Sequence, residues 1–202
     1  MGEIGDIIYI LRYILKIPSE IKKGFDAKDS IILADRYYQK GVIDLALVSI
    51  NNAIEKNKDD NDALSRLNIL KGDLLTEKGM KFYQSKVECA KIFEKSIEAF
   101  DEVTKLDPLD SVAWLGKSFS YMMVGLIYAN NEKNELKGSY YFNQSIYSAD
   151  AGLGSIEEKG PNAKVESSLW GLKGGVYYLI GEDEKGDKCF EKAGIPKTEI
   201  KV

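Results

Sequence analysis

One spacing of large, small and aromatic residues recurs along the chain. A large residue is followed four positions later by a small one, three later by an aromatic residue or leucine, and four later by a glycine. Positions three or four apart share one face of a helix, and glycine favours the turn that ends it. The pattern therefore predicts repeated helices that end at a glycine. Its two clearest copies are Trp114, Ser118, Tyr121, Gly125 and Trp170, Gly174, Tyr177, Gly181. Two weaker copies have Ser30 or Asn68 at the first position and continue with Ala34, Tyr37, Gly41 and with Gly72, Leu75, Gly79.

A second pattern follows each of these glycines. It has a small residue, an apolar residue four later, and a small or apolar residue three after that, all on one helical stripe. Small residues allow two helices to approach closely, and a ring fills the gap that remains. The sequence therefore predicts packed pairs of helices. The copies are Ala46, Ile50, Ala53; Ser96, Phe100, Val103; Gly138, Phe142, Ser145; and Gly186, Phe190, Ala193.

The stretches between these motifs indicate where helices and loops lie. Residues 80–106 contain no glycine or proline and keep apolar positions at helical intervals, which predicts one long helix. Loops are expected at 130–133 and at 151–164, which are rich in loop-forming residues. Asp107, Asp110 and Ser111 precede the third helix pair, and Asn162 precedes the fourth, so capping oxygens are expected at both helix starts.

The combined pattern resembles the tetratricopeptide repeat (TPR) family, whose motif runs W-x2-L-G-x2-Y, then A-x3-F, then P, on paired helices. The resemblance covers about residues 27–200. It departs from the family at Lys71, Lys117 and Lys173, which stand where the family has leucine, and its repeats are longer than about 34 residues. The resemblance implies an all-α, right-handed superhelix of antiparallel helix pairs, preceded by an extra helix. The expected repeats are about 27–60, 65–110, 111–166 and 167–200.

Residues 1–26 form a more apolar segment before the repeats. Within residues 4–17, an apolar stripe at helical spacing predicts an amphipathic helix that is too short to span a bilayer. Three roles remain open for it. It caps the first repeat, it inserts into the groove of its own or a neighbouring chain, or it docks on a membrane surface. The stripe consists of Ile4, Ile7, Ile8, Leu11, Ile14 and Leu15.

Composition narrows the classes of function. The chain has no histidine, which removes the commonest general base and metal ligand. A net charge of -4 argues against nucleic acid as a partner. Cys89 and Cys189 have no metal-site spacing, and with the acidic start of the chain they favour the cytoplasm. We therefore expect no enzymatic activity, no cofactor and no metal site.

In solenoids of this family the first helix of each pair lines the concave binding wall. The N-terminal half of this wall is mostly polar here. Its C-terminal half is apolar and carries adjacent methionines, which suit a hydrophobic partner helix or strand. The alternative is that the inserted segments or the N-terminal helix bury the apolar half. Carried over by position, the candidate groove residues are Ile31, Asp35, Tyr38, Ile69, Asp73, Leu115, Phe119, Met122, Met123, Gly175, Tyr178 and Leu179.

The sequence thus predicts a scaffold or adaptor that binds a peptide or helix of another protein in a partly apolar groove. One alternative is self-assembly into a homo-oligomer through residues 4–17. Another is attachment to a membrane surface through the same residues. A membrane surface is the least favoured of these partners. No glycine-rich phosphate loop supports an enzymatic function.

Overall fold

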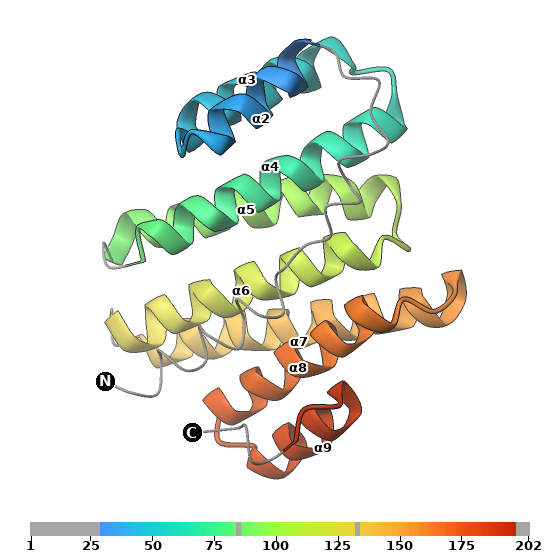
Figure 1. Cartoon of the computed structure of the whole chain (residues 1–202). Helices are drawn as coiled ribbons and strands as arrows, with labels where there is room; N and C mark the ends of the chain where they lie inside the picture. Colours follow the sequence, from blue (N-terminus) through green and yellow to red (C-terminus); the bar gives the residue numbers. More distant parts are fainter. Residues whose placement is uncertain (1–28, 84–85, 132–133, 197–202) are drawn as a thin grey trace.

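The computed structural model describes residues 29–83, 86–131 and 134–196. Within these residues the chain forms eight helices and no strands, stacked as one elongated array (Figure 1). The predicted helix over residues 4–17 lies outside them. The helices are α2 (Asp29–Gln39), α3 (Ile43–Lys56), α4 (Asn61–Lys81), α5 (Lys86–Leu106), α6 (Ser111–Asn131), α7 (Glu135–Lys159), α8 (Ala163–Leu179) and α9 (Asp183–Ala193).

Successive helices pack against one another all along the array, from α2 to α9. In addition, α4 contacts α6 and α6 contacts α8, so these even-numbered helices lie side by side. Among the described helices, the backbones of α3, α5, α7 and α9 do not approach each other in this way. The helices α4, α6 and α8 therefore form an inner wall, which α2 joins through a hydrogen bond from Tyr38 to Glu77 of α4. The odd-numbered helices form the outer layer.

Aromatic rings of the outer helices sit on glycines of the inner helices. The Phe100 ring of α5 lies between α4 and α6, where a Cβ added at Gly72 or Gly116 would fall 2.6 or 2.3 Å from it. Phe93 lies against Gly79 of α4 in the same way, at 2.7 Å. The predicted packing of small residues against rings is confirmed.

Glycine ends only two of the four inner helices as predicted. Gly41 and Gly181 have φ angles of 74° and 77°, the left-handed conformation that glycine adopts freely. Gly79 and Gly125 lie inside α4 and α6, so the prediction that they form turns is wrong. Both are buried against the rings of Phe93 and Phe142, which leave no room for a side chain.

Two further boundary predictions are wrong, and one is confirmed. Residues 80–106 do not form one helix, because α4 ends at Lys81 and α5 begins at Lys86. Most of residues 151–164 is not a loop, because α7 continues to Lys159 and buries Gly152 against Leu169. Only residues 160–162 connect α7 to α8. The connection near 130–133 is confirmed, since α6 ends at Asn131 and α7 begins at Glu135.

Two of the predicted capping side chains, those of Asp110 and Asn162, accept hydrogen bonds at the helix starts. The Asp110 carboxylate accepts a hydrogen bond from the backbone amide of Ala113 at 2.9 Å. The Asn162 side-chain oxygen accepts one from the backbone amide of Val165 at 3.3 Å. Each bond satisfies an amide that has no partner within its own helix. The helices α6 and α8 therefore begin where their capping residues indicate.

Two of the lysines that replace the family's leucine join neighbouring helices. Lys117 of α6 pairs with Asp101 of α5 at 2.5 Å, and its ammonium lies 4.6 Å from the centre of the Trp114 ring. Lys173 of α8 pairs with Asp150 of α7 in the same manner. The two lysine side chains are only 13% and 12% exposed. At both positions a partly buried ion pair thus joins an inner helix to an outer helix.

We expect the Lys117–Asp101 pair to contribute about 1 kcal/mol of coupling energy, because its lysine is largely shielded from water. A double-mutant cycle of Lys117→Met and Asp101→Asn, followed by urea unfolding, measures it. The control is the exposed pair Lys105 and Glu102, whose coupling should be near zero. Equal coupling energies in the two cycles would contradict a structural role for Lys117.

Candidate functional site

The inner wall carries a cluster of acidic side chains where α2 lies next to α4. Asp35 and Tyr38 come from α2, and Asp73 and Glu77 come from α4. The Tyr38 hydroxyl donates a hydrogen bond to Glu77, and this bond is the main cause that raises the pKa of Tyr38 to about 12. Burial and the charges of Glu77, Asp73 and Asp35 add to the shift. We call these four residues the acidic wall.

Asp73 has the most perturbed carboxyl group of the acidic wall. Desolvation raises its pKa from 3.8 to about 8, because a partly dry site disfavours the charged form. A cation brought next to this carboxyl would favour ionisation and lower the pKa again. The site can therefore hold either a proton or a basic side chain.

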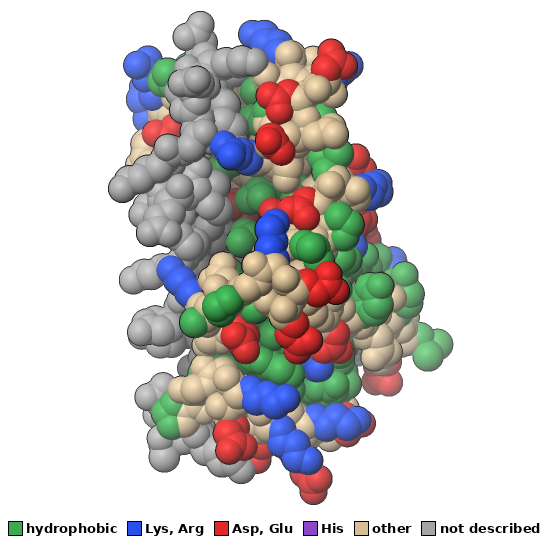
Figure 2. Space-filling view, turned by 90° about the vertical axis from the view of Figure 1, so that its right-hand side faces the viewer, with side chains coloured by type: hydrophobic (Ala, Val, Ile, Leu, Met, Phe, Trp, Pro, Cys, Tyr) green, Lys and Arg blue, Asp and Glu red, His purple; other side chains and the backbone are tan. Residues whose placement is uncertain are grey.

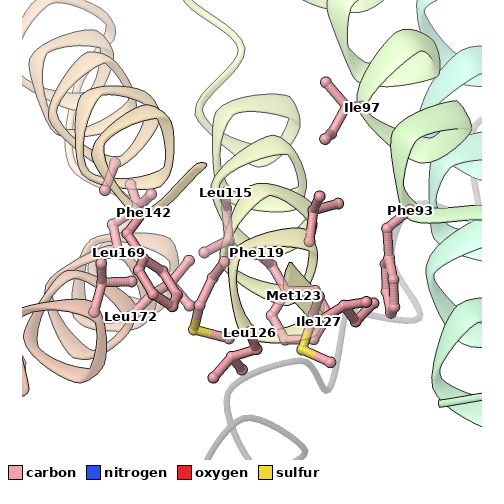
Figure 3. Close-up of a cluster of buried hydrophobic side chains, with 14 of the residues drawn as sticks. Phe93, Ile97, Leu115, Phe119, Met123, Leu126, Ile127, Phe142, Leu169 and Leu172 are labelled. Atoms are coloured by element: carbon pink, nitrogen blue, oxygen red, sulfur yellow. The ribbon is translucent and has the colours of Figure 1, made fainter. Parts of the chain in front are cut away.

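On α6 the apolar half of the predicted groove is buried. Phe119, Met122 and Met123 are 0% exposed, and Leu115 is 8% exposed. Ile69, from the mostly polar half, is 6% exposed. Figure 3 shows Phe119 and Met123 of α6 packed between side chains of α5 on one side and of α7 and α8 on the other. In this conformation these side chains are packing residues.

Three further candidate residues, Gly175, Tyr178 and Leu179, lie on α8. Tyr178 donates a hydrogen bond to Asp187, which raises its pKa to about 12, and its ring lies 5.6 Å from that of Phe190 in α9. It therefore fastens α8 to α9. A Cβ at Gly175 would meet nothing within 4 Å, so the surface there is open, and Leu179 is half-buried against the core.

The structure thus brings together Asp35, Tyr38 and Asp73 of the predicted set, but not the whole set. Ile31 lies in α2, and its side chain is outside the described ones. Glu77 is also placed on this wall by its position in the repeat. It follows Asp73 by one helical turn, on the same face of α4.

Neither cysteine has a thiol that its surroundings activate as a nucleophile or a metal ligand. Cys89 is buried, its thiol donates to the Gly79 carbonyl at 3.0 Å, and burial raises its pKa to about 11. Burial also raises the pKa of Cys189. Since the thiolate is the nucleophile and the metal ligand, both thiols are poorly reactive near neutral pH.

Other kinds of site are not found in the described part of the chain. In residues 29–83, 86–131 and 134–196, no three acidic, cysteine or histidine side chains gather closely enough to hold a metal ion. The helices described there are all too short or too polar to cross a membrane. The face drawn in Figure 2 intersperses acidic and basic side chains.

Comparison with known proteins shows the fold. No family model matches the chain, and no curated protein sequence matches it. The solved structure of TTC0263 from Thermus thermophilus, described as a thermophilic TPR protein, matches with a TM-score of 0.55 and 19% identity. The match covers 82% of this chain and 71% of that one.

Two structures of MamA match as well. MamA of MSR-1 has a TM-score of 0.52 and 14% identity, over 94% of this chain and 86% of that one. MamA of AMB-1 has a TM-score of 0.50 and 14% identity, over 98% and 86%. These likenesses confirm that the chain has an all-α, TPR-like helical-repeat fold.

Proposed function

We propose that this chain is a protein-interaction scaffold whose inner wall binds a peptide or helix of another protein. The observation that carries the proposal is the acidic wall, in which Tyr38 of α2 donates a hydrogen bond to Glu77 of α4 near the charges of Asp73 and Asp35. A basic side chain of a partner would make charge-assisted hydrogen bonds there. The TPR-like fold supports the same surface, because helical solenoids bind extended partners along their concave walls.

The raised pKa of Asp73 suggests how such a partner is recognised. A lysine or arginine next to its carboxyl would offset part of the desolvation cost and lower the pKa from about 8. Binding near neutral pH would then release a proton from the site. A neutral or acidic segment would gain nothing from this exchange, so the site selects for a basic residue.

The rest of the predicted groove has a different part in this proposal. Phe119, Met122 and Met123 form the packed floor of the wall, with no exposed area of their own. Gly175 leaves open space beside α8, where the backbone of a partner could approach closely. The partner would thus be held by its charge at the α2–α4 end and by shape along α6 and α8.

Panning a random peptide library against the full chain tests this function. We expect enrichment of peptides that contain a lysine or arginine, with an affinity that falls at least tenfold in the Asp35→Lys variant. Asp35 is exposed, so the substitution reverses a charge of the acidic wall without opening the core. Fluorescence anisotropy of an enriched peptide gives the affinity.

Glu98→Lys is the matched control, because Glu98 is an exposed carboxylate on the outer helix α5. It makes the same change in net charge away from the inner wall. If the enriched peptides bind both variants equally weakly, only overall charge is being sensed. If they bind Asp35→Lys as well as the unmodified chain, the acidic wall is not the binding surface.

A further inference from the structure

Each inner helix from α4 onward receives the outer helix of the preceding pair on one side. In α6, Gly116 accommodates the Phe100 ring of α5, and Lys117 pairs with Asp101 of α5. In α4, Leu70 stands at the position of Gly116 in the repeat and packs against a cluster that includes residues of α3. The outer helix of the preceding pair therefore packs against the inner helix at the repeat positions of Gly116 and Lys117.

The first inner helix, α2, has the same two positions, but no described helix packs against them. By the spacing of the repeat, Ile32 and Leu33 of α2 stand at the positions of Gly116 and Lys117. Their side chains are 40% and 41% exposed. Two apolar side chains thus lie open at the place where the later repeats bury an outer helix.

The outer helix of the first pair adds to this apolar surface. Leu45 and Val48 of α3 are 43% and 55% exposed, although two later outer helices present charge at these positions of the repeat. The counterparts are Lys95 and Glu98 in α5, and Lys185 and Lys188 in α9, all of them exposed.

The side on which Leu45 lies is known from a later repeat. In α7, Tyr141 is the counterpart of Ser49, and its hydroxyl donates to Glu94 of α5 at 3.1 Å, in the preceding pair. Ser49 follows Leu45 by one helical turn, so Leu45 points toward the same preceding position. We call Ile32, Leu33, Leu45 and Val48 the end face.

We propose that the end face is the docking surface for residues 4–17 of the same chain, folded as one more outer helix. This segment precedes α2 directly and carries an apolar stripe at helical spacing, from Ile4 to Leu15. The eleven residues 18–28 can span roughly 38 Å when extended, at about 3.5 Å per residue. This reach far exceeds the distance of about 10 Å between packed helices. Pro18 and Gly24 within it favour a turn rather than a continuous helix.

The covalent link selects the chain's own segment over a second copy. A short flexible connection gives an effective concentration in the millimolar range, which a separate molecule does not reach in dilute solution. An apolar helix docked in this way also covers surface that would otherwise promote association. The array would then be closed at its α2 end by its own N-terminal segment.

Hydrogen exchange with mass spectrometry on the full chain tests the docking. In the Leu45→Glu/Val48→Glu variant we expect amides of residues 4–17 to exchange at least tenfold faster than in the unmodified chain. Leu136→Glu is the matched control, since Leu136 is 88% exposed on α7 and its change should leave that exchange unaltered. All the substituted side chains are exposed, so the array should stay folded.

Deleting residues 1–24 gives the reciprocal measurement. It should speed exchange in α2 and α3 while leaving α8 and α9 unchanged, with a monomeric mass by light scattering at every concentration of the full chain. Equal exchange of residues 4–17 in the Leu45→Glu/Val48→Glu variant and the unmodified chain would overturn the proposal. So would protection that grows with protein concentration together with a dimeric mass, because a second copy would then cover the end face.

Discussion

Replacing Phe100 with alanine is expected to lower the free energy of unfolding by about 3–5 kcal/mol. The ring is 1% exposed and occupies the space between α4 and α6. Gly72 and Gly116 on either side have no side chains that could move into the cavity, so the cavity cannot close. Urea unfolding followed by circular dichroism measures the loss. Since contacts in the array run between neighbours, the two halves should also unfold less cooperatively.

Two glycine-to-alanine variants provide the control for the contact between the Phe100 ring and α6. Gly116→Ala should cost about 1–3 kcal/mol, because its Cβ would lie 2.3 Å from the Phe100 ring. Gly154→Ala in α7 should instead stabilise the protein by up to about 1 kcal/mol, because its Cβ meets nothing within 4 Å and alanine favours helix. Equal stabilities of the two alanine variants would show that the ring does not rest on Gly116.

The helical repeat could be predicted because its signal is local. The interval from Trp114 to Ser118 and Tyr121 follows from the period of the helix, and Trp170 repeats it. What the glycines do could not be predicted, because glycine serves two purposes. Gly181 adopts a positive φ angle at a turn, whereas Gly125 lies under the ring of Phe142. Only the position of the partner helix distinguishes the two uses.

The site was predicted in part for a similar reason. Position in the repeat indicates the inner side of a helix, which located Asp35, Tyr38 and Asp73. It does not indicate what covers that side, so the complete burial of Met122 could not be read from the sequence. The partner of Lys117 could not be found either, because Asp101 comes from another helix at a separation that no motif fixes.

Stability should fall as pH rises from about 4 to about 8 because of Asp73. Its pKa in the folded chain is about 8, above the value of 3.8 for a solvated carboxyl. Between these values the folded state holds a proton that the unfolded state has lost, so raising the pH favours unfolding. The stabilising contribution is complete below pH 3.8 and is lost as pH passes 8.

The Asp73→Asn variant isolates this effect, because asparagine is close in shape to the protonated carboxyl and does not ionise. We expect equal stabilities of variant and unmodified chain near pH 4, and a gap of on the order of 2 kcal/mol in favour of the variant above pH 8. A full shift corresponds to more than this, and the residual solvent contact of the side chain reduces it. Urea unfolding at a series of pH values measures the gap, with Asp59→Asn at an exposed position as the control. A gap that does not change with pH would mean that Asp73 is ionised in the folded chain, and a basic partner could then release no proton on binding.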